Sequence, residues 1–187
     1  MPSDERFPQV VSLACHDLRT PLATVYGFAR TLTRAGDLDE RSARFIAMIE
    51  EASQQLTDLL DLLGTAARIE AGGWEPALRE ADTLELATSA DERVAATGEG
   101  EPVHTDAASV SRALAALAIC AIRHGPVDAV TWHVSGRTLE LSPVTGAAAP
   151  IVVAEVLRDL GSAIARRVLE ELGASLVLDG DTLRVTL

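Results

Sequence analysis

A histidine followed closely by an acid and a hydroxyl is the part of this sequence best suited to chemistry. His16 precedes Asp17 directly, and Thr20 follows one helical turn later. Imidazole is a good nucleophile near neutral pH because much of it is unprotonated, and a carboxylate can orient the ring and take its proton. A hydroxyl one turn away can position a water molecule. The three residues predict group transfer at His16, assisted by Asp17 and Thr20.

A long amphipathic helix is predicted to carry these residues. It runs from about Arg6 to Ala35, and its apolar heptad positions are Val11, Cys15, Leu18, Leu22, Val25, Ala29 and Leu32. When this stripe faces a helical bundle, His16 and its two partners fall on the outer side, where a reactant can approach the ring in line. Pro21 removes one backbone donor, which predicts a local kink beside His16.

A second helix of the same kind is predicted after a short turn at Gly36 and Asp37, with Asp39 as its N-cap. Its apolar positions are Phe45, Ile49, Ala52, Leu56, Leu59, Leu63 and Ala66. The short connection makes the two helices antiparallel neighbours, but one hairpin alone cannot bury both stripes. We therefore expect residues 1–72 to form a hairpin that dimerises into a four-helix bundle.

The composition changes after residue 72, and residues 73–187 are predicted to form a second domain. Strand-like runs and helical segments alternate there. The predicted strands are Thr83–Ala87, Arg93–Ala96, Pro102–His104, Ala129–Val134, Thr138–Leu141, Ser175–Leu178 and Thr182–Leu187. The predicted helices are Asp106–His124 and about Ile151–Leu172. Helices on one face of a mixed sheet give a small α/β sandwich, so the chain as a whole is predicted to be α+β.

Residues 16–22 read His-Asp-Leu-Arg-Thr-Pro-Leu, which resembles the phosphoacceptor box of sensor histidine kinases at every position. The resemblance implies that His16 carries a phosphoryl group in two-component signalling. It also implies that Asp17 and Thr20 support dephosphorylation of a partner response regulator. The alternative is an ordinary surface histidine beside an ordinary proline bend, but seven consecutive matches in the correct helical register favour the phosphoacceptor.

The second domain resembles, more weakly, the ATP-binding domain of the same kinases, and its polar residues are missing. Leu117–His124 corresponds to the family's asparagine-containing helix, and Leu160–Arg167 resembles its glycine box. The two asparagine positions are Ala116 and Cys120, and the sequence contains no Asn. The stretch 141–150 has one Gly and no acid where the family reads adenine with an Asp. We therefore expect a degenerate domain that binds neither ATP nor Mg²⁺, with Gly161 as a packing glycine and no cofactor required.

Several other functions are disfavoured by composition. A net charge of −12 argues against nucleic acid as a partner. No run approaching 18 apolar residues and no leader-like start are seen, which predicts a cytoplasmic protein without a membrane span. Cys15 and Cys120 are distant in sequence and indicate neither a disulfide nor a zinc site. The remaining histidines are not grouped with other ligands at metal-site spacing, so no metal is assigned; they are His104, His124 and His133.

Three functional hypotheses follow. The first is a dimeric histidine phosphotransferase, in which His16 accepts and donates phosphoryl groups to response-regulator receiver domains. Only 15 residues precede His16, which leaves no room for a sensor segment unless the chain is a fragment. The second is an autokinase with a divergent ATP site, and the third is a regulatory scaffold without phosphotransfer. Enzymatic activity is thus expected as protein-histidine phosphotransfer, with ATP-dependent autokinase activity disfavoured.

Overall fold

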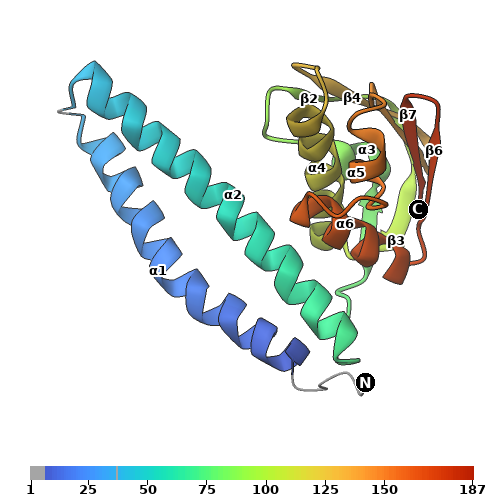
Figure 1. Ribbon diagram of the computed structural model, residues 1–187, viewed down its shortest axis with the longest axis horizontal. Helices are drawn as coiled ribbons and strands as arrows, with labels where there is room; N and C mark the ends of the chain where they lie inside the picture. Colours follow the sequence, from blue (N-terminus) through green and yellow to red (C-terminus); the bar gives the residue numbers. More distant parts are fainter. Residues whose placement is uncertain (1–6, 37) are drawn as a thin grey trace. The chain divides into compact units, whose positions relative to one another are not determined.

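The computed structural model describes residues 7–36 and 38–187, and the chain divides into two compact units. The first ends at Gly73 and the second begins at Trp74. Figure 1 shows the first as a pair of long helices and the second as helices beside a sheet. Arg6 and Asp37, which the sequence analysis assigned to a helix start and a turn, lie outside the described residues.

The first unit is an antiparallel helical hairpin. Helix α1 spans Phe7–Ala35 and helix α2 spans Glu40–Glu70, and the two pack along their length. Asp39 caps α2 as expected, because its carboxylate accepts a hydrogen bond from the backbone N–H of Ser42 at 3.0 Å. Pro21 lies inside α1.

The apolar stripe predicted for α1 is buried only in part within the hairpin, and on α2 the buried residues lie beside the predicted stripe and not on it. The buried side chains of α1 are Cys15 and Ala29, which are two heptads apart. On α2, small residues such as Gly64 and Ala67 are buried together with Leu62. Other large apolar residues of the stripes are half-buried, such as Leu22 and Leu59, or exposed, such as Leu18 and Leu56.

The second unit holds the remaining elements, and its helices pack together and on the sheet. The strands are β1 (Arg79–Asp82), β2 (Val94–Gly100), β3 (Pro102–Thr105), β4 (Val130–Gly136), β5 (Thr138–Ser142), β6 (Ser175–Asp179) and β7 (Thr182–Thr186). The helices are α3 (Thr83–Ala87), α4 (Ala107–His124), α5 (Ala149–Val152) and α6 (Leu160–Glu171). Strands β1 and β3 form an antiparallel pair, and the other five form a mixed sheet in the order β2-β4-β5-β7-β6.

One face of the five-stranded sheet makes the core of this unit. Strands β2 and β4 pair in parallel, whereas the other neighbours are antiparallel. Alternate residues of the central strands are fully buried, among them Trp132 on β4, Leu139 on β5 and Val185 on β7. Residues between them are polar and partly exposed, such as Glu140 and Arg184, which form an ion pair across β5 and β7 at 2.9 Å. The α+β class, with a helical hairpin followed by an α/β sandwich, is confirmed.

Two sequence expectations about this unit are wrong, and one strand was missed. Thr83–Ala87 is the helix α3 and not a strand, because the Asp82 carboxylate caps it by accepting from the backbone N–H groups of Leu84 and Glu85. The predicted helix Ile151–Leu172 is two helices, α5 and α6, separated by residues 153–159. Strand β1 was not predicted at all.

Helix α4 has the length and apolar composition of a membrane-crossing segment, which departs from the sequence expectation that no such stretch exists. Half of its 18 residues are buried inside the unit, as is usual for the core helix of a folded domain.

Candidate functional site

His16 lies on the outer surface of α1 because its neighbour is turned inward. Cys15 is buried against α2, where a Cβ built on Gly64 would lie 3.7 Å from the Cys15 Cβ. Successive residues of an α-helix point about 100° apart, so burying Cys15 directs His16 away from the helix pair. The His16 side chain is exposed. An incoming electrophile can therefore reach the imidazole.

The other two predicted site residues are exposed on the same helix. Asp17 adjoins His16, and Thr20 lies one turn further along, on the His16 side of α1. The Thr20 backbone carbonyl accepts a hydrogen bond from the Thr24 hydroxyl at 3.1 Å, and the Thr20 residue is exposed. A nucleophile, a carboxylate and a hydroxyl thus share one accessible stretch of helix.

A cation beside His16 was missed by the sequence analysis. His16 and Arg68 both line a groove of about 510 Å³ between the start of α1 and the end of α2. The Arg68 guanidinium donates to the Thr65 hydroxyl at 3.1 Å, which holds it over the face of α2. A guanidinium in this groove can offset negative charge that comes close to His16. The antiparallel pairing of the helices was the available signal, because it brings the end of α2 next to the start of α1.

An ion pair fixes the two helices relative to each other near His16. The Arg19 guanidinium lies 2.7 Å from the Asp61 carboxylate, and both side chains are partly buried. Arg19 belongs to the seven-residue motif, yet it faces α2 and not the exposed surface that carries His16. The Arg19–Asp61 pair therefore ties the segment of α1 that carries His16 to α2.

Comparison with known families bears directly on this hairpin. Residues 9–72 match the His Kinase A (phospho-acceptor) domain, which is nearly the whole first unit. The first unit is therefore similar to the phosphoacceptor domain of histidine kinases. It is 32% identical over 78 residues to the sensor protein DivL of Caulobacter vibrioides, and 39% identical over 72 residues to the sensor histidine kinase TrcS of Mycobacterium tuberculosis. These matches cover 42% and 37% of the chain but only 10% and 14% of the relatives.

The fold of both units also occurs in a solved structure. Full-length ShkA in complex with AMPPNP matches 95% of this chain with a TM-score of 0.56, at 22% sequence identity. The match covers 44% of ShkA. At this identity the likeness concerns the fold alone, a helical hairpin followed by an α/β domain.

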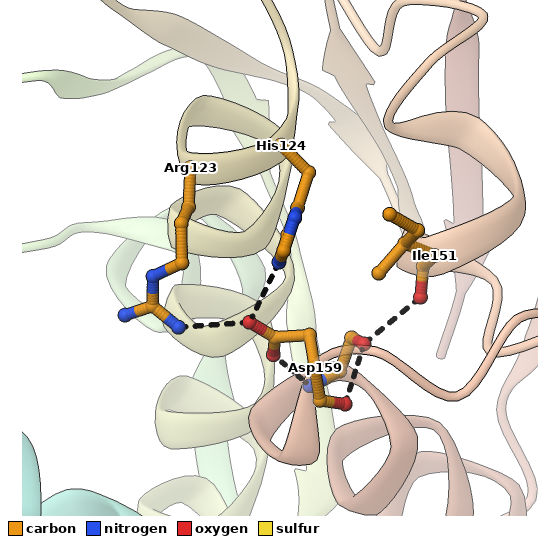
Figure 2. A network of polar contacts seen from close by, with 5 residues as sticks. Arg123, His124, Ile151 and Asp159 are labelled. Atoms are coloured by element: carbon orange, nitrogen blue, oxygen red, sulfur yellow. Dashed lines mark hydrogen bonds and ion pairs between the residues drawn. The ribbon is translucent and has the colours of Figure 1, made fainter.

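In the second unit, the two segments that resemble nucleotide-binding motifs pack against each other. Helix α4 carries Ala116 and Cys120 at the asparagine positions, and Gly161 is buried in the first turn of α6. A carboxylate fills the junction. The Asp159 side chain is 3% exposed and lies 2.8 Å from the Arg123 guanidinium and 3.3 Å from the Nε2 of His124 (Figure 2).

The same junction contains a group of potential metal ligands that the sequence analysis did not recognise. Among the described residues, donor atoms of Cys120, His124 and Asp159 all lie within 4.8 Å of one another. The view that the histidines stand apart from other ligands is therefore wrong for His124. Burial raises the pKa of the Cys120 thiol to about 11, with a smaller opposing effect from its hydrogen bond with Ser162.

Proposed function

We propose that this chain is a dimeric, cytoplasmic histidine phosphotransferase of a two-component phosphorelay. His16 accepts a phosphoryl group from the aspartyl phosphate of one response-regulator receiver domain and passes it to another. The observation that carries the proposal is the exposed His16 within a His Kinase A hairpin, next to Asp17 and facing the Arg68 groove.

The chemistry assigned to each residue follows from its position. The unprotonated imidazole nitrogen attacks phosphorus, the bond from phosphorus to the receiver carboxylate breaks, and the second ring nitrogen loses its proton. Asp17 orients the ring and accepts that proton. Arg68 offsets the negative charge of the bound phosphoryl group. Thr20 positions water when phosphate is lost from a receiver instead of being transferred.

Dimerisation is proposed through the apolar residues that the hairpin leaves uncovered. These are large side chains at helical spacing on both helices, and leaving them in water is unfavourable. The exposed residues are Phe7, Val10, Leu13, Leu18, Val25, Phe28, Leu32, Phe45, Met48, Ile49 and Leu56. A second hairpin provides a matching apolar surface by two-fold symmetry and completes a four-helix bundle, the assembly expected of a His Kinase A domain.

The second unit is proposed to serve as a scaffold that does not use ATP. Apolar Ala116 and the Cys120 thiol replace the amide ligands of the resembling kinases. The buried Asp159 carboxylate caps α6 by accepting from the Ser162 N–H at 2.9 Å, so negative charge already occupies the start of that helix. A triphosphate approaching this helix end would meet an anion of the same sign.

Phosphoryl transfer from a labelled receiver domain tests the proposal. The purified chain is incubated with a panel of phosphorylated receivers, and label on the chain is followed with time. His16→Gln is expected to abolish labelling and leave the helical content unchanged, because the side chain is exposed. His104→Gln replaces another exposed histidine and is expected to label like the parent chain. A phosphoramidate is acid-labile, so acid-stable label or undiminished label on His16→Gln would exclude His16 as the acceptor.

Titration with ATP and Mg²⁺ separates the phosphotransferase from the autokinase. We expect no saturable rise in melting temperature, since a ligand that binds only the folded state must stabilise it. A rise together with ATP-dependent label on His16 would establish the autokinase. Failure of both transfer and autophosphorylation in a folded dimer would leave the regulatory scaffold.

A further inference from the structure

Three side chains of different chemistry converge where α4 meets the start of α6. Cys120 and His124 are one helical turn apart, so both project from the same side of α4. Asp159 is the N-cap of α6 and reaches the same point from 35 residues further along the chain. Figure 2 shows the His124 ring and the Asp159 carboxylate directed toward each other.

We propose that Cys120, His124 and Asp159 bind one divalent cation of the zinc type. The proposal goes beyond the phosphotransfer reaction and uses none of its residues. A thiolate, an imidazole and a carboxylate are common Zn²⁺ ligands, whereas a thiolate disfavours Mg²⁺ and Ca²⁺. Three protein ligands leave the fourth tetrahedral position for water or an external ligand.

The donor distances suit a tetrahedral ion after small side-chain adjustments. Bonds of about 2.0–2.1 Å place nitrogen and oxygen ligands about 3.3 Å apart, and a 2.3 Å bond places sulfur about 3.6 Å from nitrogen. The His124 Nε2 and the nearer Asp159 oxygen are already 3.3 Å apart. All three donor atoms lie within 4.8 Å of one another, so the largest contraction required is about 1 Å.

The surroundings hold two ligands in place and leave one side open. Cys120 is fully buried, and the Asp159 side chain is fixed by the Ser162 N–H, while His124 is 23% exposed and faces the route to solvent. The Arg123 guanidinium lies 2.8 Å from the same Asp159 oxygen that contacts His124. A carboxylate oxygen has two lone pairs, so Arg123 can remain hydrogen-bonded as an outer partner when the cation replaces the contact with His124.

Cobalt substitution tests the site because a cobalt–thiolate bond has its own signature. The untagged full chain is titrated with CoCl₂, and the near-ultraviolet sulfur-to-cobalt band is recorded. One equivalent is expected to saturate the band, and one equivalent of ZnCl₂ is expected to bleach it. Calorimetry with ZnCl₂ alone gives the stoichiometry and affinity.

Each ligand has a matched control elsewhere in the chain. Cys120→Ala is expected to abolish the band, whereas Cys15→Ala, at the other buried cysteine, keeps it. His124→Ala is expected to weaken zinc binding at least about 100-fold, whereas His133→Ala, at an exposed histidine of β4, does not. Asp159→Ser preserves an N-cap but removes the ligand charge, so it is expected to weaken zinc binding. Asp106→Ser makes the same change at the N-cap of α4 and is the matched control, which is expected to bind zinc like the parent chain.

Circular dichroism first establishes that each variant is folded. No thiolate band on the parent chain, a band that persists in Cys120→Ala, or one that disappears in Cys15→Ala would overturn the proposed site. His16→Gln is expected to bind zinc like the parent chain, so loss of phosphotransfer and loss of the cation site are separate outcomes.

Discussion

Leu56→Asp is the sharpest perturbation of the proposed dimer. Leu56 lies on α2 and is 50% exposed in the hairpin, on the apolar side left for a second copy. An aspartate there adds a charge to a surface that assembly would remove from water. The chain offers a matched control in Val177→Asp, because Val177 on β6 is 52% exposed and lies in the other unit.

The size of the effect follows from the area that assembly must cover. Full burial of a leucine side chain contributes about 1.5–3 kcal/mol, so covering the exposed half of Leu56 contributes about 1 kcal/mol per protomer. Two-fold symmetry doubles this to about 2 kcal/mol, equivalent to about 30-fold in the dissociation constant. The unpaired carboxylates add a desolvation cost, so we expect weakening of well over 30-fold, with about 30-fold as the lower bound.

Light scattering coupled to size-exclusion chromatography, over a range of chain concentrations, measures the change. The parent chain and Val177→Asp are expected to have the mass of a dimer at micromolar concentration, and Leu56→Asp that of a monomer with reduced helical content. A parent chain that is monomeric, helical and stable would refute the reasoning, because its apolar residues would then tolerate water. An unchanged dimer of Leu56→Asp would show that another surface mediates association.

Two further outcomes test the local structure. Gly98→Ala in β2 is expected to lower the free energy of unfolding by at least about 2 kcal/mol in urea titrations. The reason is that Gly98 has a φ of +110° and that an added Cβ would overlap the Val134 carbonyl. Gly146→Ala is the control, because nothing lies within 4 Å of a Cβ at that position. Hydrogen bonds from Ser42 lower the pKa of Asp39 in the folded state below its unfolded pKa of 3.8. The stabilisation of α2 by the charged Asp39 is therefore present above the unfolded pKa and is lost as the pH falls through the folded-state pKa. Thermal unfolding of Asp39→Asn and the parent, followed by circular dichroism, should therefore differ at pH 6 and converge once the pH falls below the folded-state pKa of Asp39. A difference that persists after Asp39 is protonated would contradict this account.

The hairpin was predictable because its determinants are local and periodic. A heptad pattern fixes which side of each helix is apolar, and Asp39 marks the start of α2 by the hydrogen bond its side chain makes three residues ahead. The sequence also implied that the apolar stripes stay partly uncovered, because one hairpin alone cannot bury the stripes of both helices. Arg68 was missed because its approach to His16 depends on how α1 and α2 align, which periodicity alone does not give.

The errors in the second unit have identifiable causes. Thr83–Ala87 alternates like a strand, but Asp82 followed by Glu85 three residues later is also a helix-start pattern, and the structure follows that pattern. The helix predicted from Ile151 is interrupted because Ala154 adopts a positive φ of 56° and Asp159 caps a new helix. Capping residues were a better guide here than hydrophobic alternation over five residues.

The junction of α4 and α6 shows why the spacing of possible ligands in a sequence does not identify every ligand group. Cys120 and His124 alone are an ordinary pair on a helix, and Asp159 alone is an ordinary cap. They become a group only because α6 packs on α4, and both helices bury apolar residues that take no part in the group, such as Leu117 and Ile164. The packing of the two helices therefore gathers a thiol, an imidazole and a carboxylate that are far apart in the sequence.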